Sequence, residues 1–204
     1  ADEMAAAYCG SAAASIRIHP VVPLNNRAIR WIKPYSVEDD RLGYTERELM
    51  LRNGITPLIV SDSGDVMIQR AITSYNKNTY GGKDDSYFDI SIPYQNDYVM
   101  SRLHSVVENS MANKVLVDNT ANPRPDVPTI SPKQIHSKMV AEYADMEGMG
   151  IVENTKVFAK LLVVNKVGKG TVEVGFKPDY TEGLHVLKFM LEFRLAYTAA
   201  EMSM

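Results

Sequence analysis

The most regular hydrophobic pattern lies near the end of the sequence, where apolar side chains recur at every second position. These positions are Leu187, Phe189, Leu191, Phe193, Leu195 and Tyr197. Successive side chains of a strand point to opposite faces of a sheet, so the alternation predicts a β-strand over 187–197 with one apolar face.

Two pairs of runs rich in β-branched residues predict antiparallel hairpins. In the first pair, residues 55–60 and 66–73 flank a short polar break that contains Gly64. In the second pair, residues 157–166 and 171–177 flank the sequence Val-Gly-Lys-Gly. Glycine in a short break between two such runs is typical of a hairpin loop.

Arg70 stands out within the first hairpin. In a strand over 66–73 its side chain shares a face with Val66, Ile68 and Ile72. An unpaired charge among apolar neighbours is costly. We therefore expect either a bulge that turns Arg70 outward or an acceptor that pairs with it.

Helical segments are predicted on both sides of the first hairpin and before the second. They cover residues 2–15, a segment that Thr45 caps and that ends at Asn53-Gly54, residues 97–112, and residues 131–147 with Ser131 as the cap. The two hairpins, the terminal strand and these helices together predict an α+β fold. We expect a single core domain over 1–204, with an exposed Pro-rich loop at 118–129.

Composition excludes several classes of protein. The net charge is −3 and no basic block occurs, so nucleic acid is not an expected partner. No apolar run approaches the roughly 20 residues that span a bilayer, so membrane insertion is not expected. Cys9 is the only cysteine, which excludes a disulfide within the chain. The sequence begins without Met in a helical pattern, and we expect a fragment or a processed product.

No group of residues has the spacing of a catalytic, cofactor or metal site. The four histidines lack partners at metal-ligand spacing, and His104 with Glu108 is more typical of a surface contact. The acidic break 62–65 lacks the later oxygen ligands of a calcium loop and is explained by turn preferences. We predict that the chain is not an enzyme and needs no cofactor or metal. An active site assembled from distant loops is the alternative.

The first hairpin and its flanks resemble a known family. The stretch "RNGITPLIVSDSGDVMIQRAITSY" at 52–75 is similar to contractile tail sheath proteins of bacteriophages and phage-derived particles. The family pattern G-x-V-x-I-x-R-x-I-T-T-Y is matched here by Gly64, Val66, Ile68, Arg70, Ile72, Thr73 and Tyr75, with Ser74 in place of the second Thr. Similar segments follow the family's order: "VPLNN" at 22–26, "DSYFDI" at 85–90, "GIVEN" at 150–154 and "LEFRL" at 191–195.

The resemblance implies the C-terminal core part of a structural sheath subunit without enzymatic activity or cofactor. In this family, copies stack as rings around a tail tube, and the sheath shortens to drive the tube through the host envelope. The implied partners are further copies of the chain, the tail tube protein, and the baseplate and tail terminator proteins. The implied location is the virion, after assembly in the cytoplasm of the bacterial host. The alternatives are the sheath of a secretion system or bacteriocin, and an α+β enzyme with a scattered active site.

Two sets of residues are candidate subunit contacts. Arg70 is expected to be a structural or intersubunit ion-pair partner rather than a catalytic residue. The apolar face formed by Leu187, Phe189, Leu191, Phe193 and Leu195 is the second set. In sheath proteins terminal arms link subunits by strand addition, and the resemblance implies that role for this face. The alternative is an ordinary core strand that fills the subunit's own interior.

Overall fold

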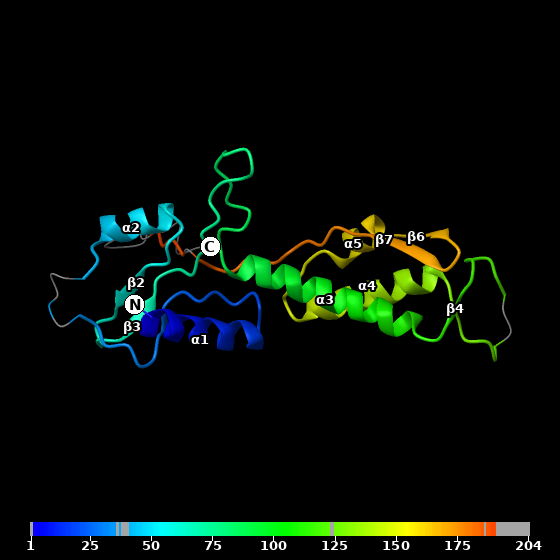
Figure 1. Cartoon of the computed structure of the whole chain (residues 1–204), viewed down its shortest axis with the longest axis horizontal. Coiled ribbons are helices and arrows are strands. Elements are labelled where there is room, and N and C mark those ends of the chain that lie inside the picture. Colours follow the sequence, from blue (N-terminus) through cyan, green and yellow to red (C-terminus); the bar gives the residue numbers. More distant parts are fainter. Residues whose placement is uncertain (1, 36, 38–40, 123–124, 186, 191–204) are drawn as a thin grey trace, which may run out of the picture.

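Two groups of elements, each around its own hydrophobic cluster, follow one another along an elongated molecule (Figure 1). The computed structural model describes residues 2–35, 37, 41–122, 125–185 and 187–190. The helices are α1 (Asp2–Ile18), α2 (Tyr44–Arg52), α3 (Ser91–Met111), α4 (Pro132–Gly148) and α5 (Thr155–Leu161). The strands are β1 (Arg27–Ala28), β2 (Leu58–Val60), β3 (Val66–Ile68), β4 (Val115–Leu116), β5 (Thr129–Ile130), β6 (Val163–Gly168) and β7 (Thr171–Gly175). The predicted α+β fold is confirmed. None of the helices in these ranges is long and apolar enough to cross a membrane.

The first cluster contains a small antiparallel sheet in the order β1-β3-β2. The predicted hairpin is confirmed, with shorter strands than expected: Leu58 pairs with Ile68 and Val60 with Val66. Val66 and Ile68 are buried because β3 is the central strand. Helix α1 is tied to the sheet by Arg27, which donates to the hydroxyls of Ser11 and Ser15 at 3.2 and 2.8 Å.

Helix α2 begins earlier than its sequence suggested. Its N-cap is Gly43 in an extended conformation, and Glu46, not Glu48, accepts a hydrogen bond from the Gly43 amide at 2.7 Å. The predicted cap at Thr45 is therefore wrong. The predicted end is confirmed: Asn53 is the C-cap, and Gly54 has a φ of +73° that glycine adopts without strain.

The second cluster lies between helices α3 and α4 and is covered by the β6–β7 hairpin. Its largest buried members are Leu103, Ile135, Met139, Tyr143, Met146 and Phe158. Ser131 caps α4 as predicted, because its hydroxyl accepts from the Gln134 amide while the Gln134 side chain accepts from the Ser131 amide. Arg102 of α3 pairs with Glu142 of α4 beside this core.

The second predicted hairpin is only partly correct. Strand β6 starts at Val163, and residues 155–161 form helix α5 where a strand was expected. Asn154 has a φ of +60° that turns the chain, and its carbonyl accepts from the Val157 and Phe158 amides. Phe158 then stacks on Tyr143 with ring centroids 3.7 Å apart. Packing against α4 thus overrides the strand preference of this β-branched run.

The segment between β4 and β5 forms a loop closed by a short parallel strand pair. Val115 lies opposite Thr129, and Leu116 lies opposite Ile130. Residues 118–122 and 125–128 are exposed. Of the predicted terminal strand 187–197, residues 187–190 are described and lie in no strand, because they pair with no neighbouring strand within the described part. Residues 191–197 lie outside the described residues.

Residues 176–185, here called the crossing segment, run from the second cluster to the first without joining a sheet of their own (Figure 1). Side chains from other elements form hydrogen bonds with several of its backbone N–H and C=O groups. The Tyr143 hydroxyl accepts from the Asp179 amide at 2.9 Å and lies 3.1 Å from the Asp179 carbonyl. The buried Gln95 side chain donates to the carbonyls of Ile151 and Thr181 at 2.5 and 3.2 Å. Burial raises the pKa of Tyr143 above the ordinary tyrosine value.

Tyr143→Phe is expected to destabilise the protein by about 1–3 kcal/mol, since it leaves the half-buried Asp179 amide without its acceptor. The matched control is Tyr44→Phe, because Tyr44 is 71% exposed. Urea unfolding followed by circular dichroism measures both variants. Equal stabilities for the two would contradict the role assigned to the Tyr143 hydroxyl.

Candidate subunit-contact site

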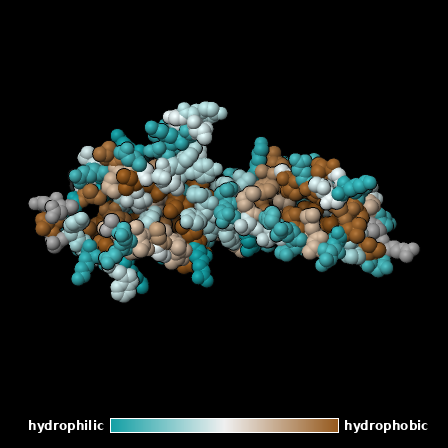
Figure 2. Space-filling model, in the orientation of Figure 1, coloured by the Kyte–Doolittle hydropathy of each residue, from teal (hydrophilic) through white to brown (hydrophobic). Residues whose placement is uncertain are grey.

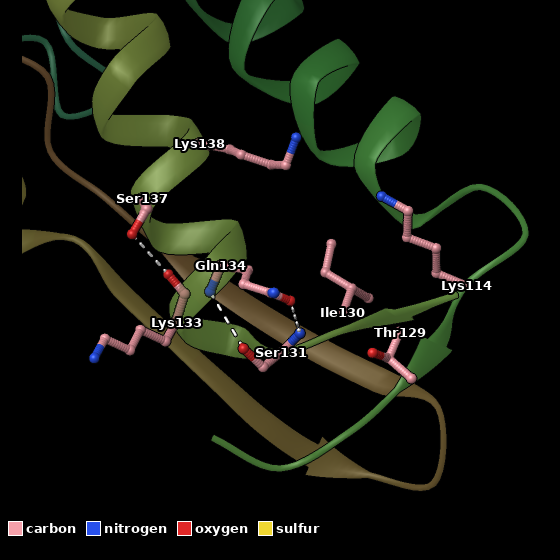
Figure 3. Close-up of a pocket in the computed structure, with 8 residues that line it drawn as sticks. All are labelled: Lys114, Thr129, Ile130, Ser131, Lys133, Gln134, Ser137 and Lys138. Atoms are coloured by element: carbon pink, nitrogen blue, oxygen red, sulfur yellow. Dashed lines mark hydrogen bonds between the residues drawn. The ribbon is translucent and has the colours of Figure 1, made fainter. Parts of the chain in front are cut away.

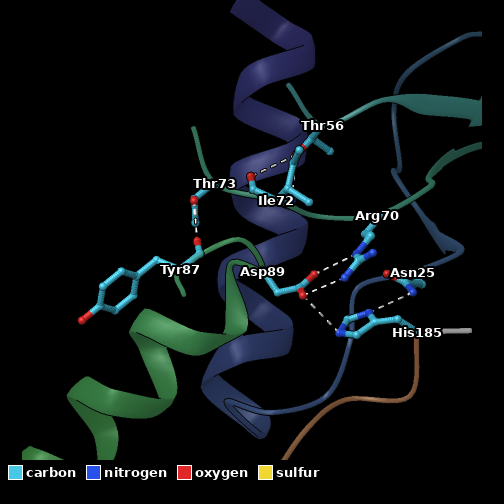
Figure 4. Close-up of polar contacts among 8 residues, drawn as sticks. All are labelled: Asn25, Thr56, Arg70, Ile72, Thr73, Tyr87, Asp89 and His185. Atoms are coloured by element: carbon cyan, nitrogen blue, oxygen red, sulfur yellow. Dashed lines mark hydrogen bonds and ion pairs between the residues drawn. The ribbon is translucent and has the colours of Figure 1, made fainter. Parts of the chain in front are cut away.

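Arg70 finds its acceptor within the same chain. Its Nε and Nη2 atoms donate to the two carboxylate oxygens of Asp89, both at 2.9 Å (Figure 4). The guanidinium also lies 4.9 Å from the centre of the Phe88 ring. The Arg70 side chain is 32% exposed and that of Asp89 13% exposed. The expectation that Arg70 needs an acceptor is confirmed, and a contact of Arg70 with another subunit stays a prediction.

The backbone brings Arg70 and Asp89 together. After β3 the chain runs antiparallel to the segment that precedes α3: Ile72 bridges Asp89, and the Thr73 amide donates to the Phe88 carbonyl at 2.8 Å. Two residues that are 19 positions apart in sequence therefore lie side by side.

The Asp89 carboxylate also faces the crossing segment. The Nε2 atom of His185 lies 3.6 Å from Asp89 Oδ2, and its Nδ1 atom lies 3.2 Å from the side-chain nitrogen of Asn25 (Figure 4). We call Asn25, Arg70, Asp89 and His185 the polar node. It joins the turn before β1, the segment after β3, the start of α3 and the crossing segment.

Residues 75–88 form a loop that projects from the region where the two groups of elements meet (Figure 1). The Asn78 side chain accepts from the amides of Tyr80 and Gly82, both at 3.0 Å. The Tyr75 hydroxyl donates to Asp84 at 2.7 Å, and this bond raises the pKa of Tyr75. Tyr80 at the tip is 95% exposed. The loop is polar, and its internal hydrogen bonds give it a defined shape.

The outer edge of β2 pairs with no other strand among the described residues. Beside the sheet lies a groove of about 740 Å³. Its lining is mostly apolar and includes Ile32, Pro34, Met50, Ile55, Leu58 and Val60. A free strand edge next to an apolar groove can accept a further strand.

The predicted apolar contact face is described only at its beginning. Leu187 is 65% exposed and Phe189 is 86% exposed. The other three members, Leu191, Phe193 and Leu195, lie outside the described residues. Hydrophobic side chains also reach the surface over both parts of the molecule (Figure 2). The described part of this face does not fill the interior of its own subunit.

A second cavity, of about 400 Å³, lies at the start of α4 (Figure 3). Lys114, Lys133 and Lys138 are among its lining residues, and the ammonium group of Lys133 points away from the other two. The first turn of α4 is already capped by Ser131.

Asp62 and Asp65 are exposed in the β2–β3 turn, where Asp65 accepts from the Ser63 hydroxyl. His104 and Glu108 form an exposed pair at 3.4 Å, as expected. Within the described ranges, no three His, Cys, Asp or Glu side chains are grouped to hold a metal ion.

The sequence was compared with known proteins and protein families. No family model matches the chain. The chain is 25% identical over 162 residues to the Mu-like prophage FluMu tail sheath protein of Haemophilus influenzae, which is 79% of this chain and 33% of that protein. The resemblance to contractile tail sheath proteins is confirmed. The chain spans about a third of the length of this curated relative.

Solved structures share the sheath fold. A chain in the anti-feeding prophage baseplate matches with a TM-score of 0.53 at 13% identity, over 82% of this chain and 44% of that one. The helical sheath of the anti-feeding prophage in its contracted state matches with a TM-score of 0.50 at 12% identity, over 86% and 45%. The sheath tail protein of Desulfitobacterium hafniense matches with a TM-score of 0.50 at 9% identity, over 79% and 37%. The sheath fold thus extends over most of this chain.

Sequence reasoning did not find the partners of Arg70. In the sequence, Asp89 stands within the segment "DSYFDI", and His185 is one of four histidines without a partner at metal-ligand spacing. The sequence carries one indication of Asp89. A charge predicted on an apolar face requires an acceptor, and "DSYFDI", which contains Asp89, is the segment similar to the sheath family that follows Arg70 in the sequence. Nothing in the local sequence of Asn25 or His185 indicates that they meet Asp89.

Arg70→Lys is expected to destabilise the protein by about 1–2 kcal/mol although it keeps the charge. Lysine cannot make the two parallel bonds to Asp89 or stack in the same way on Phe88. The control is Lys166→Met, which removes a whole charge from an ion pair whose Asp118 is 72% exposed, and which we expect to cost about 0–1 kcal/mol. Chemical unfolding measures both. A cost for Arg70→Lys no larger than that of the control would contradict the account of this ion pair.

Proposed function

We propose that this chain is the core part of a structural subunit of a contractile tail sheath. The subunit polymerises around a tail tube and contracts to drive the tube through the host envelope. The observation that carries the proposal is the 25% identity to a prophage tail sheath protein over 79% of the chain. The fold shared with a helical sheath in its contracted state supports it.

The arrangement of apolar surface supports a role in assembly. Leu187 and Phe189 expose their apolar side chains to solvent. The outer edge of β2, beside the apolar groove, pairs with no other strand in the described part. In the proposed sheath, the face that continues through Leu191, Phe193 and Leu195 pairs with a neighbouring copy by strand addition. Arg70 is a further proposed contact, because its guanidinium is partly exposed beside this region.

The remaining parts of the proposal follow from the same role. The partners are further copies of the chain, the tail tube protein, and the baseplate and tail terminator proteins. The chain acts as one core domain over 1–204 in the virion, after assembly in the bacterial cytoplasm. It has no enzymatic activity, does not bind nucleic acid and does not insert into membranes. The curated relative and the anti-feeding prophage sheath both come from prophages, so the sheath of a phage-derived injection machine is the alternative setting.

Deleting residues 196–204 tests the proposal. The deletion is expected to abolish the rings or tubes seen by electron microscopy, because it removes the end of the proposed linking segment, while the thermal unfolding midpoint stays close to that of the parent protein. Replacing residues 119–127 with nine Gly and Ser residues, which changes an equal number of residues in the exposed loop without shortening the connection between the parallel strands β4 and β5, is the matched control and should leave assembly intact.

Two results would contradict the proposal. One is normal assembly after deletion of 196–204. The other is the absence of rings and tubes from the parent protein at every concentration and salt condition tested.

A further inference from the structure

The crossing segment is fixed to the body up to His185 and not beyond it. Gly183 packs so closely on Pro23 that an added Cβ would lie 2.6 Å from the proline Cγ. The His185 side chain is only 18% exposed. Beyond it, the exposed fraction is 65% at Leu187 and 86% at Phe189. His185 therefore makes the last buried side-chain contact that the described structure shows before the terminal segment leaves the body.

The two neighbours of the imidazole define its orientation. Nε2 faces the Asp89 carboxylate, which only accepts, so the tautomer with its proton on Nε2 suits this position. In that tautomer Nδ1 is an acceptor, and the Asn25 side-chain nitrogen lies 3.2 Å from it, within donating distance. The Asn25 side-chain oxygen is buried without a hydrogen-bond partner in the described structure. Turning the amide over would place this oxygen against an acceptor nitrogen, so the contact with His185 explains its orientation.

The Asp89 carboxylate is itself held in place. Arg70 binds both of its oxygens at 2.9 Å. Asn25 is also fixed, because the next residue, Asn26, donates its amide to the Ile68 carbonyl of the central strand at 2.7 Å. The imidazole thus sits between two partners, one in the turn just before β1 and one just before the start of α3.

We propose that His185 is a positioning residue that sets where the terminal segment leaves the body and in which direction it points. We call His185 the anchor. Arg70 contributes indirectly, because it holds the Asp89 carboxylate that faces the imidazole of His185. The inference rests on the proposed function, in which the segment must reach a neighbouring copy. A fixed exit point limits the conformations of the free segment and so lowers the entropy cost of docking it.

Pulsed electron resonance distances between two spin labels on the isolated full chain test the anchor. The labels are attached at Lys188→Cys, just beyond the node, and at Arg52→Cys, at the exposed end of α2, in a Cys9→Ser background. The parent protein should give one narrow distance distribution. His185→Ala should broaden this distribution about twofold or more, because it removes both contacts of the ring.

Two variants separate anchoring from general damage. His185→Gln keeps a side-chain N–H that reaches towards Asp89 and should restore most of the narrow distribution. His104→Ala removes an exposed histidine and should leave the distribution unchanged. Thermal unfolding checks that each variant is folded. If His185→Ala does not fold, Asn25→Ala carries the test, since it removes only the contact at Nδ1.

A distribution in the folded His185→Ala protein, or in its Asn25→Ala substitute, as narrow as in the parent and centred at the same distance would overturn the inference. The measurement uses isolated subunits, so its outcome does not depend on assembly. Electron microscopy of the same variant reports on the proposed function separately. A broadened distribution with normal assembly would support the anchor and contradict the assembly role proposed for the terminal segment.

Discussion

The structure depends on how the crossing segment satisfies its backbone. This segment runs between two hydrophobic clusters and has no sheet of its own, yet its N–H and C=O groups near the core need partners. Tyr143 and Gln95 supply part of them from α4 and α3. The Thr181 amide adds a bond to the Ile151 carbonyl, and a single bridge joins Val152 and Tyr180. A few polar side chains therefore hold the crossing segment against the second cluster, a role that a longer ladder of strand hydrogen bonds would otherwise fill.

In the proposed sheath, this construction suits a subunit that keeps its lattice contacts while its neighbours move. The second cluster is packed around aromatic rings, and the polar node at Asp89 fixes the far end of the crossing segment to the first sheet. Hydrogen-bonded and charged contacts are directional, so they favour one arrangement of the two clusters. The exposed apolar side chains that follow the node are left for pairing outside the subunit in the proposed sheath.

The elements with the strongest local signals could be predicted from the sequence. Val66–Ile68 lies in a β-branched run beside a glycine turn, and Ser131 precedes a proline at the first helical turn; both signals act within a few residues. Phe158 was assigned to a strand because only its packing on α4 selects a helix. The site was predictable at Arg70, as a charge that needs an acceptor. Its partner His185 was not, because contacts between distant segments leave no periodic pattern.

Native-state hydrogen exchange of single amides tests most directly whether side chains hold the crossing segment. The Asp179 amide donates to the Tyr143 hydroxyl and so reports on a side-chain acceptor, while the Thr181 amide, which donates to the backbone carbonyl of Ile151, is the comparison; neither amide belongs to an extended sheet. The account predicts that they exchange slowly, with protection close to that of the central amides of α4. Exchange as fast as in the exposed loop at 118–122 would contradict it.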